Sequence, residues 1–179
     1  MENITEILNI DSKAKIKNVK KGDILQRQGD ITTKAYFVKK GLLRSYIIDD
    51  KGKEHIFMFA SKGWIIADIE SQEFNHATDF FIDSLEDSEI LIFDRTCFLV
   101  SEQSQLQLKN TAHLMARRIA VLQKRIIMLM SESASERYKY FLETYPELPN
   151  RVSQKMIASY LGIMPQTLSA IRNKLSRVK

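Results

Sequence analysis

Short polar side chains gather on one face of a helix predicted near the C-terminus. Gln166, Ser169, Ala170 and Asn173 recur at helical spacing, and no large apolar residue interrupts them. Glutamine and asparagine amides can each form two hydrogen bonds with the edge of an adenine base in the major groove. The chemistry that this face offers is therefore hydrogen bonding to a polar surface such as the base edges of DNA.

Two helices joined by a short turn must position that face. Ser153 can cap the first helix, Gly162 can end it in a left-handed conformation, and Pro165 can begin the second. Apolar residues three and four positions apart would pack the two helices together, namely Ile157, Ala158, Leu161, Leu168, Ile171 and Leu175. This pattern predicts a helix-turn-helix, whose second helix enters the major groove.

The charge of the chain is concentrated in the same segment. Residues 151–179 contain six basic residues and no acidic one, whereas the rest of the chain has 21 basic against 22 acidic residues. A basic module gains DNA affinity by releasing counterions from the phosphates. A helical hairpin that merely caps another domain, with a solvated basic face, is the alternative.

Composition excludes several classes of protein. The chain has 179 residues, 44% of them hydrophobic and 27% charged, with one cysteine (Cys97) and three scattered histidines. This argues against a disulfide framework, a metal site or a bound cofactor, and residues 1–18 are too polar for a secretory signal. No apolar run is long enough to span a bilayer, and no catalytic triad or paired carboxylates are recognisable. We therefore expect a cytoplasmic protein that is not an enzyme.

Residues 19–100 have the pattern of a β-sandwich. Short apolar runs alternate with Gly and Asp turns every eight to twelve residues, and the polar run 71–77 is expected to form a short helical excursion. The predicted strands are 35–38, 42–48, 55–59, 80–85 and 89–93. Their predicted core consists of Phe37, Val38, Leu43, Phe57, Phe59, Phe81, Ile82, Ile90 and Ile92.

A long helix is predicted over about 98–130. Its apolar residues are separated alternately by four and three positions: Leu108, Ala112, Met115, Ile119, Leu122, Ile126 and Leu129. Such a seam favours a parallel two-fold dimer, although it could instead pack against its own domain. The small residues after it suggest a hinge, so we predict one domain over 1–130 and a second over 131–179.

The order of sandwich, long helix, hinge and helix-turn-helix resembles the bacterial family of the cyclic-AMP receptor protein and the fumarate and nitrate reduction regulator. The segments that carry the resemblance are Gly22-Asp23 to Gly29-Asp30, Phe37-Val38 to Gly41, residues 113–118, and Ala158 to Leu168. The resemblance implies an α+β protein: an N-terminal antiparallel β-sandwich or jelly roll that senses an effector, a dimerisation helix and a DNA-reading domain. It also implies a homodimeric transcription regulator with RNA polymerase as a partner.

The resemblance assigns roles to residues of the second domain. Gln166 and Ala170 match the main base-reading positions of the family and Pro165 a third, while Ser153, Gln154, Thr167 and Asn173 match phosphate or flanking contacts. With Lys155, Ser169 and Lys174 they form the predicted DNA interface. Because Ala170 replaces an arginine that reads guanine in many relatives, a more A·T-tolerant target is expected.

Three departures from the family pattern limit the resemblance. The pairs that bind cyclic nucleotides in the family correspond here to Ala67-Asp68 and Thr78-Asp79. The arginine fork that holds the cyclic phosphate is therefore missing, Thr78 offers one hydroxyl, and Asp79 adds a repulsive carboxylate. The effector is therefore unknown and not cyclic AMP. The N-terminal cysteine cluster of the oxygen-sensing branch is missing, and no wing hairpin follows the recognition helix before Lys179.

Alternatives stay open both for the predicted pocket and for the function. Asp68 could accept a hydrogen bond from a ribose hydroxyl of a neutral or cationic ligand, or Trp64 and Phe74 could fill the pocket. The main functional hypothesis is a homodimer that reads an inverted DNA repeat. The alternative is a ligand-binding or protein-interaction module whose DNA domain has decayed.

Overall fold

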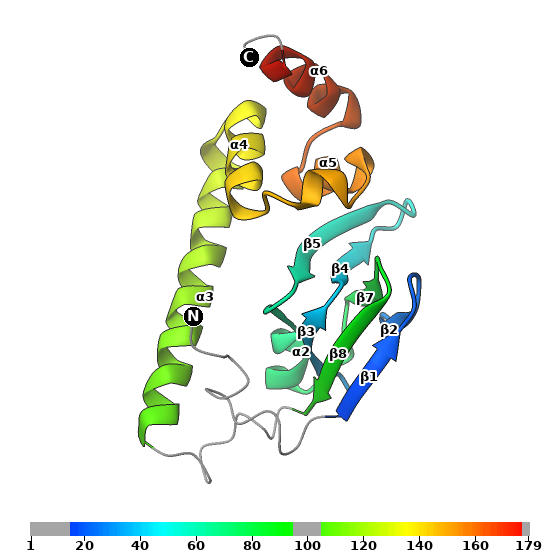
Figure 1. Ribbon diagram of the computed structural model, residues 1–179, viewed down its shortest axis with the longest axis vertical. Coiled ribbons are helices and arrows are strands. Elements are labelled where there is room, and N and C mark those ends of the chain that lie inside the picture. Colours follow the sequence, from blue (N-terminus) through cyan, green and yellow to red (C-terminus); the bar gives the residue numbers. More distant parts are fainter. Residues whose placement is uncertain (1–14, 95–104, 177–179) are drawn as a thin grey trace. The chain divides into compact units, whose positions relative to one another are not determined.

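The computed structural model describes residues 15–94 and 105–176, and it divides the chain into two compact units (Figure 1). The first unit lies within Met1–Ile47 and Phe57–Ala116, and the second within Ile48–Ile56 and Arg117–Lys179. The second unit thus includes a hairpin tip from the strand region. The predicted domain boundary near residue 130 stays a prediction.

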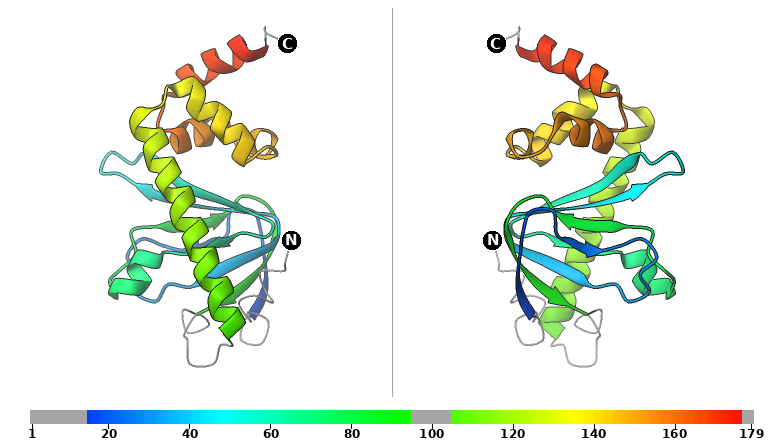
Figure 2. Two further views of the ribbon diagram at one scale, coloured as in Figure 1. Left: turned by 90° about the vertical axis from the view of Figure 1, so that its left-hand side faces the viewer. Right: turned by 90° about the vertical axis from the view of Figure 1, so that its right-hand side faces the viewer.

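Two antiparallel sheets form the sandwich of the first unit, with strand orders β1-β8-β3-β6 and β2-β7-β4-β5. The strands are β1 (Lys15–Val19), β2 (Ile24–Gln26), β3 (Ala35–Lys40), β4 (Leu42–Ile48), β5 (Glu54–Ser61), β6 (Ile65–Ile66), β7 (Phe81–Ser84) and β8 (Ser88–Phe93). The five predicted strands are confirmed as β3, β4, β5, β7 and β8; β1 and β2 precede them, and the two-residue β6 was not predicted. Helix α2 (Ile69–Phe74) overlaps the predicted excursion and lies at one edge of the sandwich (Figure 2).

The sandwich core contains most of the predicted residues, but Phe57 is not among them. Val38, Leu43, Ile82 and Ile90 are fully buried, whereas Phe57 is 37% exposed and packs against Phe80 with ring centroids 5.0 Å apart. Alternation along a strand determines which face a side chain takes, but not whether another layer covers that face at the same point. Phe81 and Ile92 are half-buried for the same reason.

A buried ion pair joins β4 to β7. Arg44 and Asp83 are opposite each other in the strand register, and Nε and Nη2 of Arg44 donate to the two carboxylate oxygens of Asp83 at 2.8 and 2.9 Å. The guanidinium also lies 4.1 Å from the ring centroid of Tyr46. Two-point hydrogen bonding of this kind offsets part of the cost of removing both charges from water.

The helices that follow are α3 (Gln105–Ser131), α4 (Ala134–Thr144), the 3-10 turn η4 (Leu148–Asn150), α5 (Gln154–Leu161) and α6 (Pro165–Ser176). The long helix is confirmed over 105–131, and its predicted first residues, 98–104, lie outside the described part of the chain together with Cys97. None of the described helices combines the length and the apolar composition that crossing a bilayer requires.

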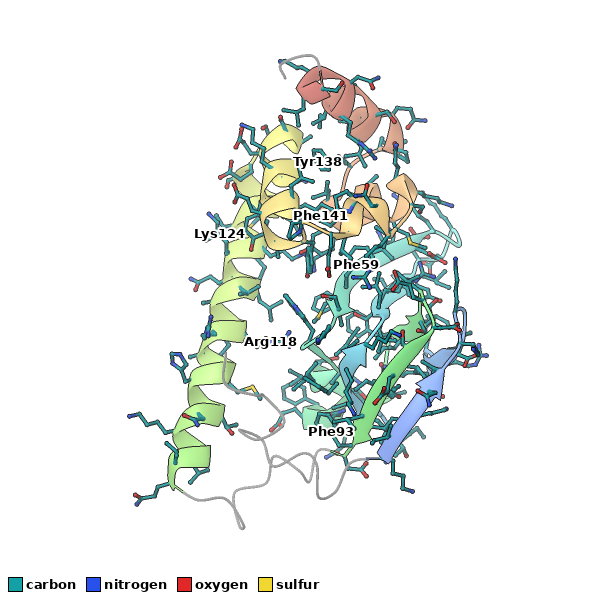
Figure 3. The ribbon with its side chains drawn as sticks, in the orientation of Figure 1. Phe59, Phe93, Arg118, Lys124, Tyr138 and Phe141 are labelled. Carbon is teal, nitrogen blue, oxygen red and sulfur yellow. The ribbon has the colours of Figure 1, made fainter. Side chains whose placement is uncertain are left out.

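Aromatic rings fill the centre of the second unit. Tyr138 and Phe141 project from α4 toward α5 (Figure 3). The ring centroid of Phe141 lies 5.6 Å from those of both Tyr145 and Tyr160, and the latter two rings meet edge to face at 5.7 Å. Burial raises the pKa of the Tyr145 and Tyr160 hydroxyls. These contacts join α4 to α5 through apolar surface and leave α6 to present its outer face.

The buried ion pair gives a prediction about stability. Asp83→Ala should lower the free energy of unfolding by about 3–5 kcal/mol, because it leaves the buried Arg44 charge without its carboxylate. Glu89→Ala is the matched control, because Glu89 on β8 is half-exposed and pairs with Lys39. It should lower the free energy of unfolding by less than about 1 kcal/mol. Urea denaturation measures both values. Equal losses in the two variants would contradict the assigned role of Asp83.

Candidate functional site

Local backbone chemistry fixes the two ends of α5. The Ser153 hydroxyl accepts a hydrogen bond from the Met156 amide at 3.2 Å, which caps the N-terminus as predicted. Gly162 ends the helix with φ 66° and ψ 34°, and its amide donates to carbonyls of the last turn. Pro165 is the first residue of α6, where its missing N–H costs nothing. The three predicted end signals are therefore confirmed.

Apolar packing between α5 and α6 sets the orientation of the outer face. Ile157, Ala158, Leu161 and Leu168 are at most 1% exposed. The remaining predicted inward residues, Ile171 and Leu175, are half-buried. Because Leu168 points inward, helical geometry turns the residues on the other side of α6 toward solvent.

All ten residues of the predicted DNA interface are exposed: Ser153, Gln154, Lys155, Pro165, Gln166, Thr167, Ser169, Ala170, Asn173 and Lys174. The structure brings the start of α5 beside α6, since the Ser169 hydroxyl lies 3.2 Å from Gln154 Oε1 and 3.1 Å from the Pro165 carbonyl. The two helices therefore present one polar surface. We call these ten residues the polar face.

Basic side chains flank the polar face. Lys155 and Lys174 are exposed and Arg172 is half-buried, while Arg151 pairs with Glu147 at 2.8 Å. Arg177 and Lys179 lie outside the described residues. An exposed surface with positive charge and amide hydrogen-bonding groups has the chemistry that phosphates and base edges require.

Helix α3 carries an exposed apolar stripe along most of the predicted seam. Met115, Ile119, Leu122 and Ile126 are 36%, 65%, 42% and 58% exposed, Ala112 is exposed, and Leu108 and Leu129 are half-buried. At the C-terminal end the stripe passes to Met130, which is 81% exposed and was not predicted. A straight helix turns every 3.6 residues, so a strict seven-residue repeat drifts around it and the next exposed position falls one residue later.

The residues that correspond to the family's cyclic-nucleotide pairs are arranged differently from the prediction. Asp68 and Thr78 are 2% and 1% exposed, Ala67 is half-buried and Asp79 is exposed. The structure thus brings Asp68 and Thr78 together and leaves Asp79 at the surface. The expectation that the Asp79 carboxylate would lie inside the pocket is wrong, because the chain turns it outward just before β7.

Asp68 uses both of its carboxylate oxygens inside the protein. Oδ1 accepts from the Ser71 amide at 3.1 Å and caps α2, while Oδ2 accepts a hydrogen bond from the Thr78 hydroxyl. Gln26 Nε2 in turn donates to the Thr78 oxygen at 3.0 Å. Sequence reasoning missed Gln26, whose only signal was a polar residue in a short strand. Because Asp68 is buried and both of its oxygens already accept hydrogen bonds, the idea that it accepts from a ribose hydroxyl stays a prediction.

The two aromatic residues that were expected to fill the pocket differ in burial. Phe74 is 71% exposed and does not fill the interior, whereas Trp64 is half-buried against the sandwich core. A hydrogen bond to the Ala77 carbonyl and then one to Glu70 raise the pKa of His76, and burial raises the pKa of Tyr36 to about 12. In the described part of the chain, no group of three His, Cys, Asp or Glu side chains is arranged to hold a metal ion.

The Asp68 network can be tested by a double-mutant cycle. Asp68→Ala and Thr78→Val should each lower the free energy of unfolding by about 1–3 kcal/mol, because each leaves a buried polar group without its partner. The double variant should lose less than the sum, because the two residues share one hydrogen bond. Chemical denaturation of the four proteins supplies the numbers. Additive losses would show that the two side chains act independently.

Comparison with known proteins links this architecture to a family. Residues 16–100 match the cyclic nucleotide-binding domain. The nitrogen fixation regulation protein FixK of Bradyrhizobium diazoefficiens is 27% identical over 169 residues, which cover 87% of this chain and 69% of FixK. The transcriptional activator protein Anr of Pseudomonas protegens is 25% identical over 166 residues, which cover 86% of this chain and 67% of Anr.

Solved structures share the fold. FixK2 from Bradyrhizobium japonicum superimposes with a TM-score of 0.74 at 20% identity, covering 92% of this chain and 85% of FixK2. A CRP/FNR-family transcriptional regulator from Thermus thermophilus gives a TM-score of 0.70 at 19% identity, covering 91% and 86% of the two chains. In its matched domain, its curated relatives and its fold, the chain is therefore similar to regulators of the family of the cyclic-AMP receptor protein and the fumarate and nitrate reduction regulator.

Proposed function

We propose that the chain is a transcription regulator that binds double-stranded DNA through the polar face. The observation that carries the proposal is the exposure of all ten residues on two helices whose ends and packing are fixed. The names of FixK and Anr, a regulation protein and a transcriptional activator, support it. RNA polymerase is the partner that such a regulator requires.

Within the polar face, α6 acts as the recognition helix of a helix-turn-helix. Gln166, Ala170 and Pro165 contact base edges, because they lie on the outer side of the first turns of α6. The remaining seven residues contact phosphates or flanking groups. Phosphate contacts fix the register of the protein on DNA, and base contacts supply the sequence preference.

The apolar stripe of α3 forms the interface of a homodimer. An exposed row of large apolar side chains at alternating spacings of three and four is buried most effectively by its own copy in a parallel pair. A two-fold dimer then presents two recognition helices to an inverted repeat, with half-sites about one helical turn, roughly 34 Å, apart.

The sandwich acts as a sensing or coupling domain that does not take a cyclic nucleotide. Asp68 and Thr78, which are predicted to correspond to the family's nucleotide-binding positions, are buried and hydrogen-bonded to each other, and neither supplies the arginine fork that a cyclic phosphate needs. The proposed effector is therefore of another chemical class.

Dimer formation can be tested at the centre of the apolar stripe. Ile119→Glu combined with Leu122→Glu should produce monomers, because two charges per copy would be forced into an apolar interface. Ala120→Glu combined with Gln123→Glu changes exposed residues outside the stripe and should leave the dimer intact. Analytical ultracentrifugation at micromolar concentration measures the mass. A wild-type protein that sediments as a monomer would refute the proposed interface.

DNA recognition can be tested by selection from random sequences followed by binding measurements. The wild-type protein should enrich an inverted repeat and lose affinity steeply with added salt. Gln166→Ala should cost about 1–3 kcal/mol at one base pair and relax the preference there. Lys155→Ala should weaken binding to all sequences alike and reduce the salt slope by about one.

The outcome of the selection separates the two functional hypotheses. Loss of preference at one position in Gln166→Ala, with a uniform loss in Lys155→Ala, would establish the assigned roles. If no inverted repeat is enriched, the polar face does not read DNA, and the protein-interaction or ligand-binding module becomes the better account of the chain.

Cyclic nucleotides provide the third test. Isothermal titration calorimetry with cyclic AMP and cyclic GMP should show no saturable binding at low micromolar concentration, because loss of a two-point charged contact costs on the order of 2–5 kcal/mol. Thr78→Arg combined with Asp79→Ser restores the residue types of the family's second pair and is the complementary variant. Saturable binding to the wild-type protein would show that the pocket has been misassigned.

A further inference from the structure

We propose that Arg137 is a positioning residue for DNA recognition, which holds α5 against the C-terminal end of α3 and thereby sets the half-site spacing that the dimer accepts. The inference rests on the proposed function and deepens it. Arg137 belongs to the first turn of α4 and is not part of the polar face. It would act on DNA only through the helices that it joins.

All three nitrogens of the Arg137 guanidinium donate to main-chain carbonyls. Nη2 donates to Leu129 at 2.8 Å, Nε to Glu132 at 3.1 Å and Nη1 to Leu161 at 3.1 Å. Leu129 lies in the last turn of α3, Glu132 follows that helix, and Leu161 is the last residue of α5. One side chain therefore connects the ends of two helices and the segment after α3.

The chemistry of these helix ends explains why an arginine is needed. The last four carbonyls of a helix have no partner within it and carry partial negative charge, so a cation is favourable there. The planar guanidinium directs its donors at fixed angles, whereas a lysine ammonium is a single mobile charge. Directed hydrogen bonds to the ends of α3 and α5, with a third to Glu132 just after α3, define the angle between the two helices more closely than apolar packing alone.

The two helix ends also approach each other closely at this point. A Cβ added at Gly162 would lie 3.6 Å from both Arg137 Nη1 and a methyl group of Leu129. Arg125 makes a second connection, because its guanidinium lies 4.2 Å from the Tyr160 ring centroid and 3.4 Å from the Tyr160 carbonyl. A ring face tolerates sliding, so the shorter and more directional bonds of Arg137 are the ones that fix the angle.

Arg137 lies between α3, the helix proposed to form the dimer, and the pair α5 and α6 that is proposed to bind DNA. The apolar stripe of α3 would hold the second copy, and α5 leads through a three-residue turn to α6, which Leu168 fixes by its burial. A change of angle between α3 and α5 would therefore move the two recognition helices of a dimer relative to each other. Adding one base pair to the spacer moves the two half-sites apart by about 3.4 Å and rotates one relative to the other about the DNA axis. A dimer with a fixed angle between α3 and α5 cannot then contact both half-sites.

Arg137→Lys tests the inference, with Arg117→Lys as the matched control on an exposed position of α3. The probe is a duplex carrying the inverted repeat that the wild-type protein selects, together with versions whose central spacer is one base pair shorter or one or two longer. Fluorescence anisotropy gives the dissociation constants. Wild type and Arg117→Lys should prefer the selected spacing by about tenfold or more, the scale of a mismatched base pair.

Arg137→Lys should bind the selected spacing more weakly, and its preference for that spacing should fall to about two- to threefold. Without the three hydrogen bonds, the angle between α3 and α5 can vary, so the dimer can bind altered spacers, but fixing that angle on binding costs affinity.

An affinity loss that is equal at all spacings, or no loss, would overturn the inference while leaving DNA binding intact. Arg137→Gln provides a second variant if the first does not fold. Failure of both to fold would assign Arg137 a purely structural role and also overturn the inference. Absence of a selected repeat in the wild type would instead remove the proposed function.

Discussion

Two half-buried arginines, Arg125 and Arg137, join the helices of the second unit through hydrogen bonds to backbone carbonyls. A guanidinium stays charged in proteins, so its removal from water must be offset by acceptors in fixed positions. Arg137 finds three carbonyls at the ends of α3 and α5, and Arg125 reaches those of Ile56 and Tyr160 at 3.2 and 3.4 Å while lying over the Tyr160 ring. These contacts hold α5 in place through main-chain acceptors, so its position does not depend on carboxylates that would neutralise the adjoining basic segment.

Helix α3 can serve two purposes because its faces differ. One side carries Arg125 and Met128, which pack within the chain, and Met128 is only 2% exposed. Burial also lowers the pKa of Arg118, one helical heptad before Arg125. The other side keeps large apolar residues such as Ile119 in solvent, and contiguous apolar surface of this kind marks a site of association. The internal contacts and the centre of the proposed dimer interface therefore involve different residues, whereas Leu129 at the C-terminal end of the seam also contacts Arg137 within the chain.

The sandwich contains a buried polar network. Asp68 caps α2 and accepts a hydrogen bond from the Thr78 hydroxyl, whose oxygen also accepts one from Gln26. A carboxylate that is buried needs such donors, since an unpaired charge there would be costly. The same bonds that make Asp68 tolerable hold α2 to the start of β7.

The sequence alone determined the features that depend on local backbone chemistry and periodicity. Ser153, Gly162 and Pro165 mark helix ends because each has a conformational or hydrogen-bonding property that only such positions use, and the spacing of Leu168 places it inside. The main strands and the long helix followed in the same way. Tertiary structure decided which distant groups meet. Periodicity within one segment carries no information about the segment that lies opposite it in space. Four features depend on that neighbour: the pairing of Arg44 with Asp83, the contact of Thr78 with Gln26, the exposure of Phe57 and the hydrogen bond from Arg137 to Leu161.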